Sequence, residues 1–260
     1  MEKTRIITKE VEPLRNPILI EGLPGIGLVG KLAAEHMIKE LKAEKIAELY
    51  SPHFPHQVLM LKKGIIRMLK NKFYLWRNPD EKGSDIVILI GDVQAITSEA
   101  QFEVCGEMIK YFKGLGGSTV YTLGGYGTGK VVDKPKVFGS ATHKDIIKDY
   151  EKHGVIFGEA NGSIIGAAGL LLGIGKLEGL RGVCLMGETH GGYVDAKSAQ
   201  SVLEMLSKIL GVKMDLSKLQ HRAKESERFM KKMETEAKKQ QGAMGGGQLP
   251  LANDDVSYIR

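Results

Sequence analysis

Cysteine is scarce in this chain of 260 residues. Its two cysteines, Cys105 and Cys184, are too few for a disulfide framework or a cysteine zinc site. Long apolar runs are also missing, because the most apolar stretch, Ile164 to Ile174, is interrupted by glycines and is far shorter than the roughly 20 residues of a membrane span. The first residues, Met1 to Arg5, carry alternating charges and no apolar segment, so we expect no secretory signal. These absences predict a cytoplasmic protein with no metal site and no membrane partner.

Aromatic residues are few as well. They make up 6% of the chain, and no basic segment is interleaved with aromatic side chains that could stack on bases. The net charge of +6 is therefore interpreted as a solubility charge, or as a complement to an acidic protein partner. Nucleic-acid binding through the basic C-terminal helix is a third and less favoured hypothesis. With 42% hydrophobic and 26% charged residues, the chain can bury the core of one globular α/β domain with appendages.

A glycine-rich segment, Gly22 to Gly30, organises the first part of the chain. It follows the apolar run Pro17 to Ile20 and precedes a helical pattern, which is the first unit of a parallel α/β sheet. Gly25, Gly27 and Gly30 have the G-x-G-x-x-G spacing of a dinucleotide-binding turn. The alternative is structural, since glycines also permit a tight turn and close packing of helix on sheet. Pro24 precedes the first glycine, and Tyr50-Ser51-Pro52 stands where a ribose-binding acid would be expected, which weakens the dinucleotide interpretation.

Apolar runs and helical periodicities alternate through the rest of the chain up to Leu210. The pattern predicts a doubly wound, mostly parallel α/β sheet with helices on both faces. Short strands between two of these units predict an antiparallel insertion. The expected strands are 17–20, 46–50, 57–61, 65–69, 73–76, 85–91, 118–123, 131–132, 137–138, 155–157 and 182–187. The expected helices are 27–41, about 98–113 with Ser98 as N-cap, 142–150, one from 162 onward, and 195–210.

Two further loops carry residues that could do chemistry. Gly124, Gly129 and Lys130 have P-loop spacing, but Val131 replaces the required Ser or Thr and no long helix can start at Val132 to Pro135. The segment after the last strand holds Glu188, His190 and Asp195, which could act as acid/base groups or metal ligands, although Asp195 also suits the N-cap of the next helix. An alternative hypothesis is thus a small-molecule or nucleotide-binding enzyme that uses the loops at Gly25, Gly27, Gly30, Gly124, Gly125 and His190.

The composition changes beyond Gly211. Apolar residues recur there at alternating steps of three and four, which is a heptad seam. Such a helix either lies on its own domain or pairs with copies of itself, and the narrow seam favours self-association into a homo-oligomer, with a tetramer as one candidate size. The oligomer helix is assigned to Leu216, Leu219, Ala223, Met230 and Met233, with Ser226 as the polar member.

The last residues form a linker and a tail. Residues 242–248 are rich in glycine and predict a flexible linker, and about twelve such residues reach about 20 Å. Val256, Tyr258 and Ile259 follow close to Arg260, so the tail is expected to be a ligand for a pocket on another protein, although a frayed terminus is the usual alternative.

The chain resembles the proteasome assembly chaperone family in its archaeal form. The resemblance rests on Pro17 to Gly30, the Gly124-Gly125-Tyr126 loop and the Gly187-Glu188 strand end, and covers roughly Pro17 to Leu210. It implies a phosphorylase-like sandwich without established catalysis or cofactor. It also implies a homo-oligomer that binds the proteasome α-ring of the 20S core through C-terminal tails without ATP, to aid assembly or open the gate. The expected domains are 1–212 for the family domain, 213–241 for the C-terminal helix, and 242–260 for the linker and tail.

The family's implied tail motif is a hydrophobic residue, tyrosine, any residue, then the carboxylate. Here Tyr258 is third from the end, Ser257 precedes it, and Ile259 occupies the tyrosine position. The resemblance assigns partner binding to Val256, Tyr258, Ile259 and Arg260, with docking either shifted by one residue or anchored on Ile259.

Overall fold

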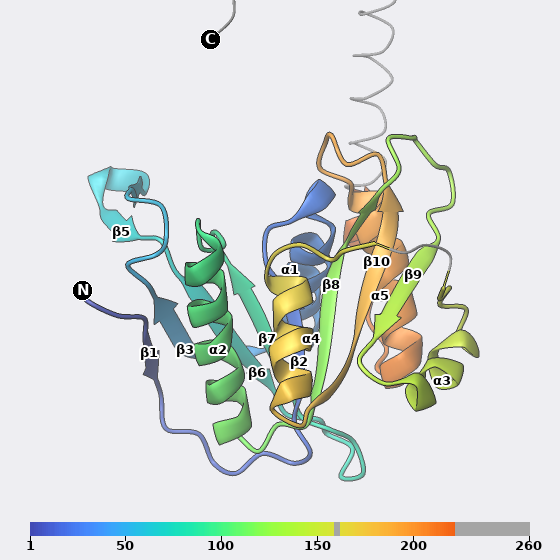
Figure 1. Ribbon diagram of the computed structural model, residues 1–260, viewed down its shortest axis with the longest axis horizontal. Helices are drawn as coiled ribbons and strands as arrows, with labels where there is room; N and C mark the ends of the chain where they lie inside the picture. The colour runs from blue at the N-terminus through green and yellow to red at the C-terminus, as the bar shows by residue number, and fades with distance from the viewer. Residues whose placement is uncertain (159–161, 222–260) are drawn as a thin grey trace, which may run out of the picture.

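An eight-stranded sheet with helices on both faces forms the body of the molecule (Figure 1). The computed structural model describes residues 1–158 and 162–221. The strand order is β1-β3-β6-β7-β2-β8-β10-β9, and β4 and β5 form a separate hairpin. The strands are β1 (Arg5–Thr8), β2 (Ile18–Gly22), β3 (Glu44–Tyr50), β4 (Val58–Met60), β5 (Ile66–Met68), β6 (Asn71–Trp76), β7 (Ile86–Gly91), β8 (Thr119–Gly127), β9 (Val137–Ala141) and β10 (Arg181–Thr189).

The centre of the sheet is parallel. β7, β2, β8 and β10 run in the same direction, and the pairs on either side of them are antiparallel. β2 is buried along its whole length and β7 nearly so, which explains why both read as continuous apolar runs. The predicted doubly wound, mostly parallel sheet is therefore confirmed.

Two layers of helices cover the sheet. α1 and α5 pack together on one face, and α2 and α4 pack on the other (Figure 1). α5 begins at its N-cap Asp195, whose carboxylate accepts a hydrogen bond from the Ser198 amide, and ends at Gly211 in the left-handed region. The helices are η1 (Ile26–Leu28), α1 (Val29–Leu41), η2 (Lys62–Gly64), α2 (Ser98–Gly114), η3 (Lys144–Ile146), α3 (Ile147–Glu151), α4 (Ala167–Leu177) and α5 (Ala196–Leu210).

Some predicted boundaries were wrong. The side chain of Thr97, and not that of Ser98, caps α2, because Thr97 keeps an extended backbone and accepts from the Ala100 amide. The insertion is split, since β6 joins the main sheet between β3 and β7 while β4 and β5 leave it. Residues 124–127, interpreted as part of a loop, continue β8 and pair with the end of β10. The sequence pattern also missed β1, a short edge strand on β3.

The packed core continues past residue 212. Residues 217–221 are helical, and Leu219 is 1% exposed within the core that α1 and α5 share. Leu216 packs against the same core. The rest of the predicted oligomer helix, including Ala223, Met230 and Met233, and the whole of 242–260 lie outside the described residues.

Candidate functional site

The carboxyl edge of the sheet gathers the loops that the sequence singled out. Because β2, β7, β8 and β10 are parallel, the glycine turn after β2, the segment after β7 and the ends of β8 and β10 all lie at this edge. Open parallel sheets bind ligands at this position. A cavity of about 480 Å³ lies there, and Glu21, Gly25, Gly124 and Gly125 are among the residues that line it.

Glu21 is the buried ionisable group of this cavity. It is 1% exposed although its strand is otherwise apolar. Its Oε1 accepts a hydrogen bond of 2.7 Å from the Leu23 amide, whereas Oε2 has no hydrogen-bond partner. Burial raises the pKa of Glu21 to about 8, although the backbone amides of Leu23 and Leu123 act in the opposite direction. The side chain is therefore mainly a neutral acid at pH 7.

Gln94 holds the edges of the cavity together. Its Nε2 donates to the Pro24 carbonyl at 2.7 Å, and its Oε1 accepts from the Ala167 amide at 2.9 Å. The glycine turn is thereby tied to the first residue of α4. Gln101 donates a further hydrogen bond to Gln94 Oε1, so the Gln94 oxygen accepts two hydrogen bonds and its nitrogen donates one.

The fingerprint glycines serve mainly packing. A Cβ on Gly30 would lie 2.1 Å from the Leu123 carbonyl oxygen, so this glycine lets α1 approach β8. Gly27 has a φ of +61°, and its carbonyl accepts from the Asp195 amide at 2.8 Å. Neither lines the cavity, whereas Gly25 does. The G-x-G-x-x-G spacing therefore reflects the fit of turn, helix and strand.

The loop after β10 is structural in its contacts. Asp195 caps α5, as expected from the sequence, and its Oδ2 also accepts from the Thr189 hydroxyl at 2.6 Å. His190 accepts a hydrogen bond from the Gly192 amide and packs against Tyr193, but it does not line the cavity. Within residues 1–158 and 162–221, no three His, Cys, Asp or Glu side chains are grouped as metal ligands.

The two thiols are buried and unreactive in character. Burial raises the pKa of Cys105 and of Cys184 to about 12, so neither forms an appreciable thiolate at neutral pH. Lys130 is likewise not part of a phosphate loop: among the described residues, the next helical segment after it is η3, which begins at Lys144. No described helix is long and apolar enough to cross a membrane.

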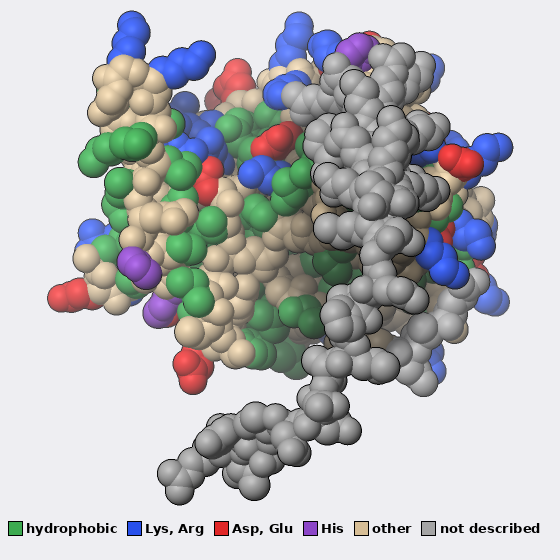
Figure 2. All heavy atoms as spheres, turned by 90° about the horizontal axis from the view of Figure 1, so that it is seen from above, with side chains coloured by type: hydrophobic (Ala, Val, Ile, Leu, Met, Phe, Trp, Pro, Cys, Tyr) green, Lys and Arg blue, Asp and Glu red, His purple; other side chains and the backbone are tan. Residues whose placement is uncertain are grey.

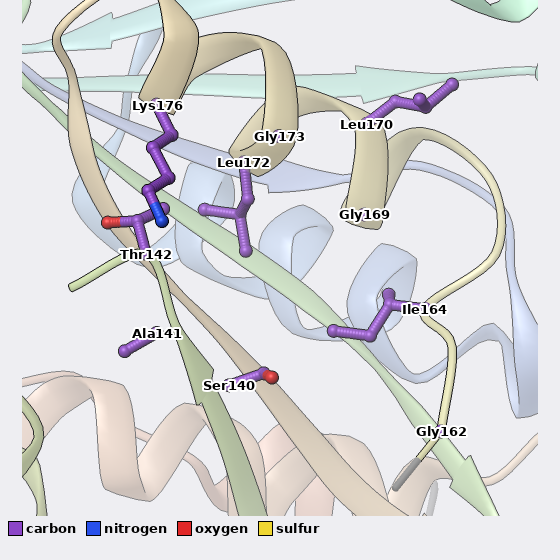
Figure 3. A pocket seen from close by; sticks show the side chains of 10 residues that line it. All are labelled: Ser140, Ala141, Thr142, Gly162, Ile164, Gly169, Leu170, Leu172, Gly173 and Lys176. Atoms are coloured by element: carbon purple, nitrogen blue, oxygen red, sulfur yellow. The ribbon is translucent and has the colours of Figure 1, made fainter. Parts of the chain in front are cut away.

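A second hollow lies between α4 and β9 (Figure 3). It measures about 420 Å³, and its lining includes Ser140, Thr142, Ile164 and Lys176. The Thr142 hydroxyl is engaged with the backbone of Gly182 at the start of β10. The hydroxyl of Thr142 thus joins the end of β9 to the start of β10.

The β4–β5 hairpin presents an exposed apolar face. Val58 pairs with Met68 and Met60 pairs with Ile66, and all four side chains are about half exposed or more, with Met60 at 85%. Hydrophobic side chains gather over this part of the molecule, at the left of Figure 2. We call these four residues the hairpin face. Contiguous exposed apolar surface makes the hairpin face a candidate contact surface.

The comparisons with known proteins fit this architecture. The model of the PAC2 family matches residues 19–234. The chain belongs to the PAC2 family. This confirms the predicted resemblance and its coverage of the α/β domain.

Three relatives place this PAC2-family chain among archaeal proteins. Pyrococcus furiosus PbaB, an archaeal proteasome activator, is 46% identical, with a TM-score of 0.86 over 90% of this chain and 100% of that chain. Pyrococcus furiosus PbaA, an archaeal homolog of proteasome-assembly chaperone, is 31% identical, with a TM-score of 0.74 over 94% and 96%. An uncharacterized protein of Methanocaldococcus jannaschii is 40% identical over 100% of this chain and 99% of its own length.

Sequence reasoning found part of this site. It singled out Gly25, Gly124 and Gly125, which line the cavity together. It missed Glu21, whose signal was a charged residue inside an otherwise apolar strand, and Gln94, for which a single sequence carries no signal. The predicted partner-binding residues Val256, Tyr258, Ile259 and Arg260 lie outside the described residues.

Proposed function

We propose that this chain is an ATP-independent proteasome assembly chaperone or activator that binds the proteasome α-ring through its C-terminal tail. The observation that carries the proposal is its likeness to PbaB, an archaeal proteasome activator, at 46% identity over the whole of that chain. The PbaA likeness supports the assembly role in the same way.

The described geometry supports independence from ATP. Gly30 is closed against Leu123, and Lys130 is followed by Val131 and not by a helix that could hold phosphates. No Lys or Arg is among the described residues that line the cavity at the carboxyl edge. We therefore propose that the protein functions through contacts with other protein chains.

The tail supplies those contacts in this proposal. In this proposal, the glycine-rich linker 242–248 lets the end of the tail reach a pocket on the ring. Val256, Tyr258 and Ile259 supply the apolar and aromatic side chains that bind there. Several tails on one oligomer raise the effective concentration at the ring, so that weak single contacts suffice.

Self-association provides the several tails. We propose that the seam from Ala223 to Met233 pairs with other copies, because the start of that helix is already fixed on the domain at Leu219. The hairpin face is the second surface that we assign to contact with another copy. Sedimentation velocity separates the two: truncation after His221 and the double substitution Met60→Ser with Ile66→Ser should each reduce the mass of the assembly. An unchanged mass in one variant removes that surface from the proposal.

The proposal is tested with proteasome α-rings and core particles. The full chain should co-elute with α-rings without nucleotide, and removal of Val256 to Arg260 should abolish co-elution while the thermal unfolding midpoint stays unchanged. Faster hydrolysis of a fluorogenic peptide by preassembled core particles would indicate activation, and faster formation of core particles from subunits would indicate assembly. Failure of the full chain to bind, or undiminished binding by the truncated chain, contradicts the tail model.

A further inference from the structure

Three neighbouring parallel strands carry a row of buried polar side chains. Glu21 on β2 lies in register with Thr122 on β8, and Thr122 lies in register with Cys184 on β10. All three are buried at 1% exposure or less. Their strand neighbours Leu19 and Val120, two residues away, belong to the core beneath α2 and α4, so the row faces that layer.

Glu21 is the member of this row that points to a ligand. Its Oε2 is buried and has no hydrogen-bond partner, while Oε1 is held by the Leu23 amide. A buried polar atom without a partner costs roughly 1–3 kcal/mol, and more where it is charged. A buried polar atom without a hydrogen-bond partner is rare in native proteins and calls for an explanation, such as a functional role. Glu21 and Cys184 both line the cavity of about 480 Å³.

The rest of the cavity is mostly apolar and is accessible. Leu23, Ile164 and Met186 contribute walls, and Gly124 leaves the β8 backbone open, because a Cβ there would meet only Met186 at 3.9 Å. Ile26 and Ile165 also line the cavity, and both are exposed, Ile165 at 88%. Mostly apolar walls with a few polar groups are typical of a small-molecule site.

Charge selects the class of ligand. The described residues that line the cavity include no Lys, Arg or His, so no positive charge there would offset the repulsion between the Glu21 carboxyl and a phosphate or carboxylate. The other polar side chains of the lining, Gln94, Tyr126 and Ser163, are uncharged. The thiols of Cys105 on α2 and Cys184 on β10 both interact electrostatically with Glu21, and neither supplies positive charge. A cation that donates a hydrogen bond fits both the charge and the unused oxygen.

We propose that this cavity binds a small molecule with an apolar or aromatic body and a cationic N–H group, an amine or an amidine, which donates to Oε2 of Glu21. This is a function in addition to the contacts with other chains. The proposed ligand is thus a cation, and not the phosphate or nucleotide that the glycine spacing suggested.

A proton accompanies binding. In the empty cavity at pH 7, the Glu21 acid is mostly protonated, because burial raises its pKa to about 8. A cation at Oε2 favours the carboxylate, so the proton on the acid leaves to solvent as the ligand enters. The cation–carboxylate pair keeps the net charge of the site at zero. Proton release is therefore a signature that nonspecific binding to the apolar walls does not produce.

The test uses three molecules of nearly the same shape: benzamidine, benzamide and benzoate. Calorimetry of the full chain at pH 7, in two buffers with different ionisation enthalpies, should show benzamidine binding with release of close to one proton. Benzamide should bind at least about tenfold more weakly without proton release, and benzoate should not bind. Preference for benzoate, or no binding of benzamidine, overturns the proposal.

Two variants locate the site. Glu21→Gln keeps the shape of the side chain and should lose at least about tenfold in benzamidine affinity together with the proton release. Ile165→Arg alters an exposed residue at the cavity, so that the fold is retained while a like charge opposes the ligand. Glu107→Gln is the matched control, because it makes the same change at a carboxylate on α2 that does not line the cavity, and it should retain both benzamidine affinity and proton release. Unchanged benzamidine binding in Glu21→Gln or in Ile165→Arg contradicts the assignment.

Discussion

The α-carbon of Gly30 faces the carbonyl of Leu123 so closely that a Cβ would lie 2.1 Å from the carbonyl oxygen. The contact joins the first turn of α1 to the middle of β8, two elements far apart in the sequence. The glycine that completes the dinucleotide-like spacing is thus required by packing.

This contact predicts unequal effects of two substitutions in the same motif. Gly30→Ala should lower the free energy of unfolding by about 3 kcal/mol or more, because a backbone carbonyl cannot give way. Gly25→Ala should change it by less than about 0.5 kcal/mol, since Gly25 is extended at a φ of −152° and a Cβ there meets nothing within 4 Å. Urea unfolding of both variants checks this. Equal effects would show that the glycines share some other role.

Glu21 predicts a pH dependence of stability. Its folded pKa, about 8, lies above the ordinary value of 4.5, so the unfolded chain releases this proton at lower pH than the folded chain. Stability should therefore fall as pH rises from about 4.5 to about 8, with a slope from this group of up to about 1.4 kcal/mol per pH unit.

The substitution Glu21→Gln removes this contribution to the pH dependence of stability. Relative to the parent chain, the variant should gain roughly 4 kcal/mol in unfolding free energy between pH 5 and pH 8.5. Denaturant unfolding at several pH values between these limits measures it. Parallel pH profiles for parent and variant would mean that Glu21 is ionised in the folded chain at neutral pH.

Leu219 predicts that the start of the C-terminal helix belongs to the folded domain. Leu219→Ala should lower unfolding free energy by about 2–4 kcal/mol, because its side chain is buried in the core of α1 and α5. Lys218→Ala, which alters an exposed side chain paired with Glu40, should cost less than about 0.5 kcal/mol. Chemical denaturation of a chain ending at 241 keeps tail contacts out of the comparison. A Leu219 effect as small as that of Lys218 would contradict the packing.

The hydrogen bonds of Asp92 fix the β4–β5 hairpin to the rest of the domain. The Asp92 carboxylate accepts two hydrogen bonds from Arg67 on β5, at 2.5 and 2.9 Å, and one from the Lys70 amide. Asp92→Ala should increase hydrogen exchange and proteolysis of residues 57–69 severalfold, because an isolated two-stranded ribbon is marginally stable. Exchange in β2 and β8 should change little. Unaltered protection of the hairpin would show that other contacts hold it.

Strong local signals explain what could be predicted from the sequence. The apolar runs of β2 and β7 and the caps of α5 at Asp195 and Gly211 define elements without reference to the rest of the chain. Strand order could not be predicted, because the partner of β6 depends on long-range pairing. The glycines of residues 124–127 predict a loop, because glycine is disfavoured in strands, and only pairing with β10 makes this segment a strand.

The candidate site was predictable only in outline. The glycines mark the carboxyl edge from the sequence, but the role of Glu21 depends on its burial and on an oxygen without a partner. The burial of Glu21 and its unpaired oxygen depend on how three strands and α4 pack together, which a local sequence pattern does not specify. The tail was recognisable by composition and by resemblance, and its contacts remain a prediction.

The central claim is tested most directly by the affinity of the full chain for immobilised proteasome core particles, measured with and without Val256 to Arg260. The matched control is Asn253→Ala with Asp254→Ala, which keeps the tip and the length of the tail. We predict at least about a hundredfold loss of affinity in the truncated chain, since it loses every tail of the assembly at once, and less than about threefold in the control. Equal affinity of the full and truncated chains would contradict the account.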